Sequence, residues 1–331
     1  MKVLCIGGTG NISQPCVEAA LDAGDEVTLL TRGQRPSPFG DRVRVLKGDR
    51  DEPRALEAAA AHSPDAVVDF VAYHPMQVEA ALSAFSGRTG QYLFISSAAA
   101  YKKPLPHPVV TEETPLENPF WEYAREKIAC EARLVRAHQD QGFPVTIVRP
   151  SYTYGETWIP TAFAGHDYTI VDRIRSGRSV LCHGDGTSLW VMTHARDFAV
   201  GLVGLFGRSE ALGEAVHITS DEVLTWNRIY ELIGEAAGCE VDLVHVPSDL
   251  VAAICPERGG SLFGDKAHSV IFDNSKIRGL VPEFRPRIGF AEGVARSVAW
   301  YDADPARRVP SAETNERIES VLAAQRRALE A

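Results

Sequence analysis

Short runs of apolar residues recur at intervals through the first half of the chain. They are rich in Val, Ile and Leu, and they do not alternate with polar residues. Runs of this kind are typical of strands that are buried on both faces of a parallel sheet. We therefore predict strands at Val3–Ile6, Val27–Leu30, Val43–Leu46, Ala66–Val71, Tyr92–Ile95 and Val145–Val148.

Helical patterns lie between these runs. Apolar residues spaced three and four apart predict helices at about 12–23, 53–62, 75–86 and 119–141. Strand and helix thus alternate, which predicts an α/β fold in which helices cover both faces of a parallel sheet. The second half is less regular, with helices predicted near 194–206, 225–237 and 290–303 and short strands near 215–218 and 242–246.

This change of pattern divides the chain. We predict that residues 1–150 form the sheet domain and that 151–310 form mainly a smaller, mixed α/β domain. Some elements of about 190–220 and 265–303 are expected to return to the sheet. The last segment, 311–331, places its apolar residues on one stripe and is predicted to be an amphipathic helix.

Composition and charge exclude several classes of protein. The chain has 331 residues, 45% hydrophobic and 24% charged, which is ordinary for a soluble globular protein. Its net charge of −10 opposes a role in binding nucleic acid, because a phosphate backbone would be repelled. The six cysteines are scattered, so we expect reduced thiols and no metal site. Neither a signal peptide nor a membrane span is predicted, and we expect a cytoplasmic location.

Glycines follow the first predicted strand. The segment CIGGTGNIS places Gly7, Gly8 and Gly10 between a strand and a helix. Glycines in this context let the backbone approach a pyrophosphate, and the helix presents its first amides to the anion. We therefore predict a Rossmann-type doubly wound sheet that binds a dinucleotide. The predicted contacts in this turn are Gly7, Gly10, Asn11 and Ile12.

The ends of the next two strands bear on the choice of cofactor. In LLTRGQR, Arg32 stands where an NAD-specific site would have an acidic residue for the ribose hydroxyls. A guanidinium suits a 2′-phosphate, so the sequence slightly favours NADP over NAD, although a solvated basic loop explains Arg32 equally well. Asp49, after the third strand, is positioned to accept a hydrogen bond from the adenine amino group.

The helix predicted at 119–141 begins with WEYAREK and carries Tyr123 and Lys127 at i and i+4, on one face. One such pair is weak evidence alone. Together with GGTG, GD, YLFISSAAAY and VRPSYTYG, it resembles the extended short-chain dehydrogenase/reductase superfamily, and more narrowly its NAD-dependent epimerase/dehydratase group. GDGTSLW, DNSKIRGL and RIGFAEGVARSVAWY extend the resemblance over nearly the whole chain.

The resemblance implies a catalytic set. Tyr123 would be the acid/base, and Lys127 would lower the pKa of its phenol and hold the nicotinamide ribose hydroxyls. Ser97 would orient the substrate oxygen, with Ser96 as the fallback for this role. The resemblance also implies a homodimer and a substrate-binding second domain. Further cofactor contacts would come from the strand ends at Phe70, Val71, Ala72 and Pro150.

The residues after Ser97 narrow the reaction. Dehydratases of this family carry an acid pair there, whereas this chain has Ala98, Ala99 and Ala100. Alanine cannot transfer a proton, so dehydration is disfavoured. We expect an epimerase that acts on a sugar or nucleotide sugar through a transient ketone. A net reductase or dehydrogenase of a sugar or nucleoside-like alcohol is the alternative, and a non-catalytic, RNA-associated relative is a remote one.

The substrate contacts are less well marked. Trp190 occupies a position where many sugar-nucleotide enzymes have an Arg that grips a diphosphate, so it either stacks on the substrate or packs in the core. Tyr152 likewise replaces a common Asn. His74 follows the fourth strand and could touch cofactor or substrate. An anion clamp could instead come from Arg287, or from Arg173 or Arg175.

Overall fold

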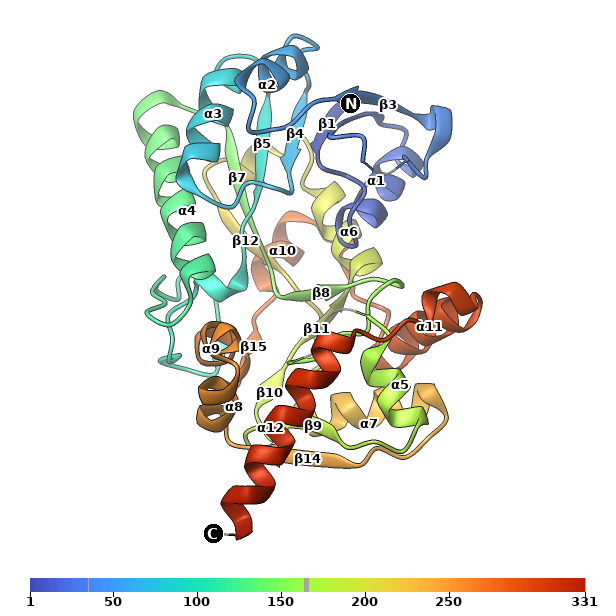
Figure 1. The fold of residues 1–331 in the computed structure, drawn as a ribbon. Helices are drawn as coiled ribbons and strands as arrows, with labels where there is room; N and C mark the ends of the chain where they lie inside the picture. The colour runs from blue at the N-terminus through green and yellow to red at the C-terminus, as the bar shows by residue number, and fades with distance from the viewer. Residues whose placement is uncertain (35, 164–166, 331) are drawn as a thin grey trace.

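A computed structural model describes residues 1–34, 36–163 and 167–330, and its centre is a seven-stranded parallel sheet (Figure 1). The strand order is β12-β7-β5-β4-β1-β2-β3, so the direction of winding reverses between β1 and β4. The predicted α/β, Rossmann-type doubly wound sheet is therefore confirmed. Its strands are β1 (Lys2–Ile6), β2 (Glu26–Thr31), β3 (Val43–Lys47), β4 (Ala66–Asp69), β5 (Gln91–Ile95), β7 (Val145–Pro150) and β12 (Ala215–Ile218).

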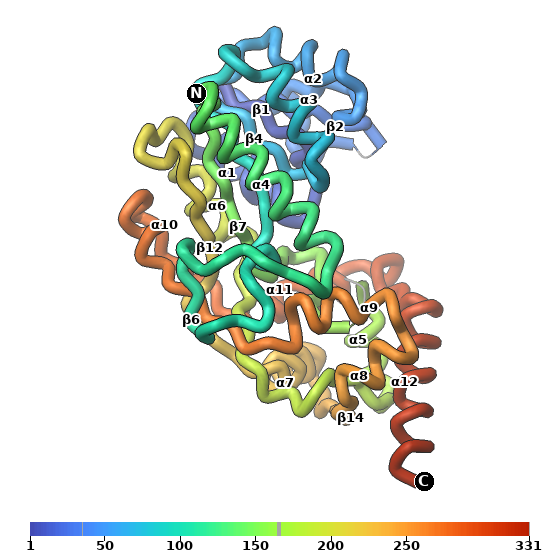
Figure 2. Tube along the Cα trace, turned by 90° about the vertical axis from the view of Figure 1, so that its left-hand side faces the viewer, coloured from blue at the N-terminus to red at the C-terminus, as the bar shows by residue number. Residues whose placement is uncertain are grey.

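Helices cover both faces of the sheet, which explains why its strands are apolar without alternation. On one face, α1 (Ser13–Asp22) packs against α6 (Ala195–Gly204). On the other, α2 (Pro53–Ala60), α3 (Pro75–Phe85) and α4 (Glu122–Gln141) lie side by side (Figures 1 and 2). The helix α4 ends where Gly142 adopts a φ of +67°.

The remaining elements gather beyond the carboxyl edge of the sheet, in the lower half of Figure 1. We call this part the cap. Its core is aromatic, with the rings of Trp190 and Trp226 at 5.3 Å, and the C-terminal helix packs on it through Ile318 and Val321. The cap helices are α5 (Thr169–Arg175), α7 (Trp226–Ala237), α8 (Ser248–Ile254), α9 (Pro256–Ser261), α11 (Phe290–Asp302) and α12 (Ala312–Glu330), and a π-helical turn, η4 (Leu262–Lys266), follows α9.

The chain crosses between the two parts more than once. The strand β12 and the helix α6 come from the second half of the sequence but belong to the sheet and its cover. Ile277 of α10 (Ser275–Leu280) lies in the core beneath α1 and α6, whereas α11 packs on α7 in the cap. Of the segment 265–303, α10 thus joins the sheet layer and α11 does not.

Short strand pairs join the irregular parts of the cap. The strands of the pairs β10–β13 and β15–β6 have two residues each. Those of the pair β11–β8 have three residues each, and those of the pair β14–β9 have four. Only β14 (Leu243–Val246) was predicted, because strands this short carry no recognisable period. The others are β6 (Val109–Val110), β8 (Tyr152–Tyr154), β9 (Val180–His183), β10 (Leu189–Trp190), β11 (Met192–His194), β13 (Leu224–Thr225) and β15 (Ile271–Phe272). Within the described residues, no helix combines the length and apolarity that crossing a membrane requires.

Candidate active site

The turn after β1 has the geometry of a phosphate-binding turn. Gly7 and Gly8 have φ values of +100° and +107°, which residues with a side chain rarely adopt. A Cβ on Gly8 would lie 2.8 Å from Cδ2 of Leu29, so β2 leaves no room for one. The amide of Gly10 donates to Oγ of Ser13 at 2.9 Å, and α1 then begins with amides that have no helical carbonyl to pair with.

Asn11, in the same turn, adds an observation that favours an anion. Its Oδ1 accepts a hydrogen bond from the amide of Gly155 at 3.0 Å, which ties the turn to the loop after β8. Its Nδ2 is buried and has no hydrogen-bond partner among the described residues. A buried donor without a partner is unfavourable unless a ligand supplies the acceptor. The turn therefore fits the pyrophosphate of a dinucleotide.

The other predicted cofactor contacts also lie at this edge of the sheet. Arg32 follows β2 and is exposed, and Asp49 follows β3 and is partly buried. Phe70 and Val71 follow β4, and a Cβ on Gly7 would lie 3.4 Å from each of them. Of these strands, β4 lies beside β1 at the point where the strand order reverses, and open α/β sheets bind their ligands at such a point.

Two consecutive serines end β5, and the structure separates their roles. The Ser96 hydroxyl is buried and donates to Oε1 of Glu131 on α4. Ser97 instead lines a cavity, and its Oγ accepts the amide of Ala99 at 3.2 Å. Only Ser97 is therefore open to a substrate, whereas Ser96, the fallback for that role, bonds within the protein.

Tyr123 lines the same cavity, near the start of α4. Burial raises the pKa of its phenol to about 12, and a hydrogen bond with the side chain of Ser97 acts in the opposite direction. The two side chains therefore lie close together on one wall of the cavity, and their catalytic roles stay predictions. We expected Lys127 to lower this pKa, whereas the observed shift is upward and burial is its largest cause.

Lys127 lies one helical turn further along α4 and is fully enclosed. Its Nζ donates to the carbonyl of Ala72, shortly after β4, at 2.6 Å. It also donates to the carbonyl of Ile95, the last residue of β5, at 2.8 Å. It also lies 4.8 Å from the ring centre of Tyr73 and 5.8 Å from that of Tyr123. Burial lowers the pKa of Lys127 to about 8. The ammonium thus bridges two strand ends beside the phenol.

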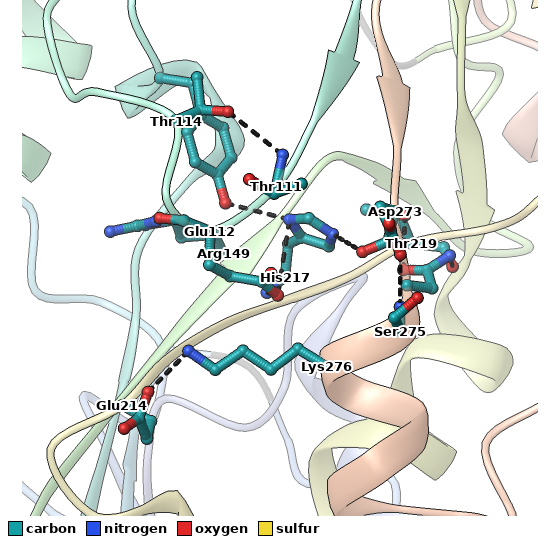
Figure 3. A network of polar contacts seen from close by, with 12 residues as sticks. Thr111, Glu112, Thr114, Arg149, Glu214, His217, Thr219, Asp273, Ser275 and Lys276 are labelled. Carbon is teal, nitrogen blue, oxygen red and sulfur yellow. Dashed lines mark hydrogen bonds and ion pairs between the residues drawn. The ribbon is translucent and has the colours of Figure 1, made fainter.

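A buried polar network supports the turn that carries Ser97. Arg149 of β7 binds Glu131 through Nε and Nη2, and its guanidinium lies 4.9 Å from the ring centre of Tyr101. The Tyr101 hydroxyl lies 3.0 Å from Nδ1 of His217, whose Nε2 lies 2.8 Å from the carbonyl of Asp273 (Figure 3). That carbonyl can only accept, so Nε2 carries the proton and Nδ1 accepts from the tyrosine. Burial lowers the pKa of His217, in keeping with a neutral ring.

The cavity that joins these groups has a volume of about 350 Å³, within the usual range for small-molecule sites. Its sheet-side wall contains Ile12, Ser97, Tyr123 and Pro150, so the glycine turn and the two hydroxyls open onto one space. The cap contributes aromatic and charged side chains. Among the latter, the sequence analysis missed Lys103, Arg258, Asp265 and Lys266, which come from loops and a short helix without a recognisable motif.

Another residue that the sequence analysis missed, Asn118, links the elements around the cavity. It is only 2% exposed. Its Nδ2 donates to the carbonyls of Ala99 at 2.9 Å and Gly264 at 2.7 Å, and its Oδ1 accepts the amides of Phe120 and Trp121. One side chain thus links the turn after Ser97, the start of α4 and the cap.

The predicted substrate contacts separate into two groups. Tyr152 and Trp190 line the cavity, and Trp190 also packs on Trp226 in the core of the cap, so its stacking on a substrate stays a prediction. Arg287 is exposed and does not line it, and His74 precedes α3 without lining it. Arg173 and Arg175 are held in ion pairs with Glu319 and Asp302, so neither is a free anion clamp.

A parallel doubly wound sheet, a phosphate-binding glycine turn and a Tyr–Lys–Ser set at its carboxyl edge define a nicotinamide-dependent enzyme of the short-chain dehydrogenase/reductase type. Comparison with known families narrows this class. A sequence model of the NAD dependent epimerase/dehydratase family matches residues 3–218, more than half of the chain. The protein belongs to this family.

Individual relatives are distant. A 2′-dehydrokanamycin reductase of Streptomyces kanamyceticus is 28% identical over 87% of this chain and 81% of its own length. A chloroplast stem-loop binding protein of Arabidopsis thaliana is 26% identical over 74% of this chain and 65% of its own. The fold resembles that of a UDP-glucuronic acid 4-epimerase from Bacillus cereus, with a TM-score of 0.74 at 17% identity, covering 92% of this chain and 99% of that one.

Proposed function

We propose that this enzyme uses NAD(P) to oxidise and re-reduce one carbinol carbon of a sugar or nucleotide sugar, so that the net reaction is epimerisation through a transient ketone. One observation carries this proposal. The hydroxyls of Ser97 and Tyr123 meet at the wall of a cavity that Ile12, in the glycine turn, also lines. A substrate hydroxyl held there would be within reach of a proton acceptor and of a bound nicotinamide.

The chain's own groups would divide the work as follows. Tyr123 would take the proton of the substrate hydroxyl during oxidation and return it to the ketone oxygen during reduction. Ser97 would orient that oxygen, and Lys127 would supply positive charge beside the phenol. A bound dinucleotide would supply the hydride acceptor and donor, held by the turn around Gly7 and Asn11.

The wall next to Ser97 argues against dehydration and decarboxylation. Ala98 and Ala99 line the cavity there and cannot transfer a proton. Among the described lining residues the one carboxylate is Asp265, which lies 3.5 Å from Nζ of Lys266 on the cap side. Hydride transfer with a single acid/base remains the best-supported chemistry.

Net reduction of a ketone is the second candidate. The similarity to a 2′-dehydrokanamycin reductase favours it, and so does the protonation of Tyr123, since burial raises the pKa of the phenol and leaves a proton ready for a ketone oxygen. An RNA-associated role is less well supported, because the net charge is −10 and the catalytic hydroxyls meet in a cavity. NADP preference, a homodimer and a cytoplasmic location stay predictions.

The substitution Tyr123→Phe tests the proposal. It should preserve folding and dinucleotide binding but lower turnover by about 100- to 10,000-fold, the usual contribution of a positioned acid/base. Tyr168→Phe is the matched control, since that phenol bonds Arg175 and does not line the cavity. Near-normal turnover by Tyr123→Phe would remove the phenol from the chemistry.

Absorbance at 340 nm separates the two candidates. An epimerase should purify with its dinucleotide bound and convert substrate without a steady change in absorbance. A net reductase must exchange the dinucleotide and consume one reduced equivalent for each product formed.

A further inference from the structure

The cavity has the opposite charge to the chain as a whole. The net charge of the protein is −10, yet the charged side chains among the described residues that line the cavity are three cations and one acid. The cations are Lys103, Arg258 and Lys266, and the acid is Asp265. A low-dielectric cleft lined by one sign of charge concentrates ligands of the other sign.

Lys103 is the strongest of these observations. It is only 3% exposed, it lines the cavity, and its ammonium makes no hydrogen bond or ion pair with any described residue. The charge of Asp265 acts on it from beyond ion-pair distance. Lys102, its neighbour, has a partly exposed side chain that pairs with Glu117 at 2.7 Å. The Lys103 side chain is thus enclosed by protein while its ammonium, without a partner among the described residues, faces the cavity, where it can bind an anionic group of a ligand.

The other two cations come from adjacent cap elements. Arg258 of α9 has a buried Nε without a partner among the described residues, and it has no acid within ion-pair distance there. Lys266 ends the π-helical turn, a local geometry that is frequent at functional sites. Its Nζ lies 3.5 Å from Oδ2 of Asp265, so its charge is partly offset, and it lies 5.4 Å from the ring centre of Trp121 and 5.6 Å from that of Tyr152. The cations thus lie among aromatic walls.

We infer that Lys103, Arg258 and Lys266 bind an anionic oxygen group of the substrate, a phosphate or a carboxylate, while the aromatic walls pack on its rings. The inference rests on the proposed function, because it concerns the substrate of the same cavity. The anion is not that of the dinucleotide, whose pyrophosphate belongs in the turn after β1. The same charge excludes a cationic amino sugar as the preferred substrate.

Binding to the enzyme loaded with NAD, measured by calorimetry without turnover, tests this inference. The anionic probes are dTDP and glucuronate, and their neutral counterparts are thymidine and glucose. Kanamycin, which carries protonated amines, is the cationic probe. At least one anionic probe should bind at millimolar concentration or below and more tightly than its counterpart, and kanamycin should not bind. A preference for dTDP identifies a diphosphate, and a preference for glucuronate identifies a sugar carboxylate.

Substitutions then assign the effect to residues. Lys103→Met should weaken the binding of the anionic probe about 10- to 150-fold, which is the effect of losing a charge-assisted hydrogen bond. It should leave the affinity for NAD unchanged. Lys102→Met, at the partly exposed neighbour, is the matched control and should have no effect. Arg258→Gln is a second test in case the lysine variant folds poorly, and it should weaken the same probe.

Three results would overturn the inference. They are equal binding of neutral and anionic probes, no binding of either anionic probe, and equal effects of Lys103→Met and Lys102→Met. None of them would bear on the hydride chemistry, which the Tyr123→Phe measurement tests separately.

Discussion

Asn118 joins the catalytic turn, the start of α4 and the cap, so Asn118→Ala should disturb all three at once. The substitution removes the donor for the carbonyls of Ala99 and Gly264 and the acceptor for the amides of Phe120 and Trp121. The side chain is buried, so water cannot readily replace it at the two carbonyls. The amides lie next to solvent, because Phe120 is exposed.

The structure sets the scale of this effect. Each buried carbonyl left without a donor costs about 1–3 kcal/mol, so the variant should lose about 2–6 kcal/mol of unfolding free energy. Domains of this kind are stable by about 5–15 kcal/mol, so most of the protein should stay folded at low temperature. A shift of about 1 Å between catalytic groups costs about 100-fold in rate, and we expect turnover to fall about 10- to 100-fold.

A matched control separates positioning from stability. Asn274 is also 2% exposed, and its Nδ2 donates to the carbonyl of Thr219 and to Asp221, away from the cavity. Asn274→Ala should lose comparable stability in urea unfolding but keep its turnover. Asn118→Ala should lose turnover while its affinity for the dinucleotide, bound at the glycine turn, changes little. Equal losses of turnover in the two variants, both measured folded, would refute the positioning role.

Two further substitutions test the cofactor side of the site. Arg32→Ala should weaken the binding of NADP far more than the binding of NAD in fluorescence titrations. Equal effects on the two affinities would show that the guanidinium does not bind the 2′-phosphate. For Lys127, burial lowers the pKa from 10.5 to about 8, so between these values the unfolded chain binds more protons and stability rises with pH. Relative to Lys127→Met, the wild type should gain up to about 3 kcal/mol of unfolding free energy over that interval. A difference that does not vary with pH would contradict the buried charge.

The sheet domain was predictable because its strands and helices differ in their apolar patterns. The strands are short continuous apolar runs, whereas the helices repeat apolar residues at intervals of three and four. The apolar runs after Val27 and Val145 lie within two residues of the observed strands, and even the short run at 215–218 is β12. In the cap, the helices predicted at 225–237, 290–303 and 311–331 correspond to α7, α11 and α12, but its short strands other than β14 were not predicted. Its two-residue strands pair across long stretches of sequence, as Leu189 does with Thr225, and no local pattern encodes such a pairing.

The candidate site divides in the same way. The glycine turn and the Tyr123–Lys127 pair are local motifs, so their spacing along the chain already fixes their relation in space. Lys103 has no such signal, because in the sequence it is one half of a Lys-Lys pair before a proline and looks like a surface loop. Only the folded cap, which brings Arg258 and Lys266 to the same cavity, shows that it is enclosed.

The burial of Glu131 could not be predicted from the pattern of the helix. Glutamate on a long helix is usually solvated, yet this one is 2% exposed and is held by Ser96 and by Arg149. It follows Tyr123 and Lys127 at the same four-residue interval, so the three side chains occupy successive turns on one face of α4. Each turn of that face is therefore bonded to the carboxyl edge of the sheet.

This arrangement also bears on the direction of Ser97. Consecutive residues at a strand end point to opposite sides, so a bond that draws Ser96 toward Glu131 turns Ser97 toward the cavity. The four-residue spacing that sets Tyr123 above Lys127 then brings the phenol to that serine. One turn beyond Lys127, Glu131 thus ties α4 to the end of β5 through Ser96 and to β7 through Arg149.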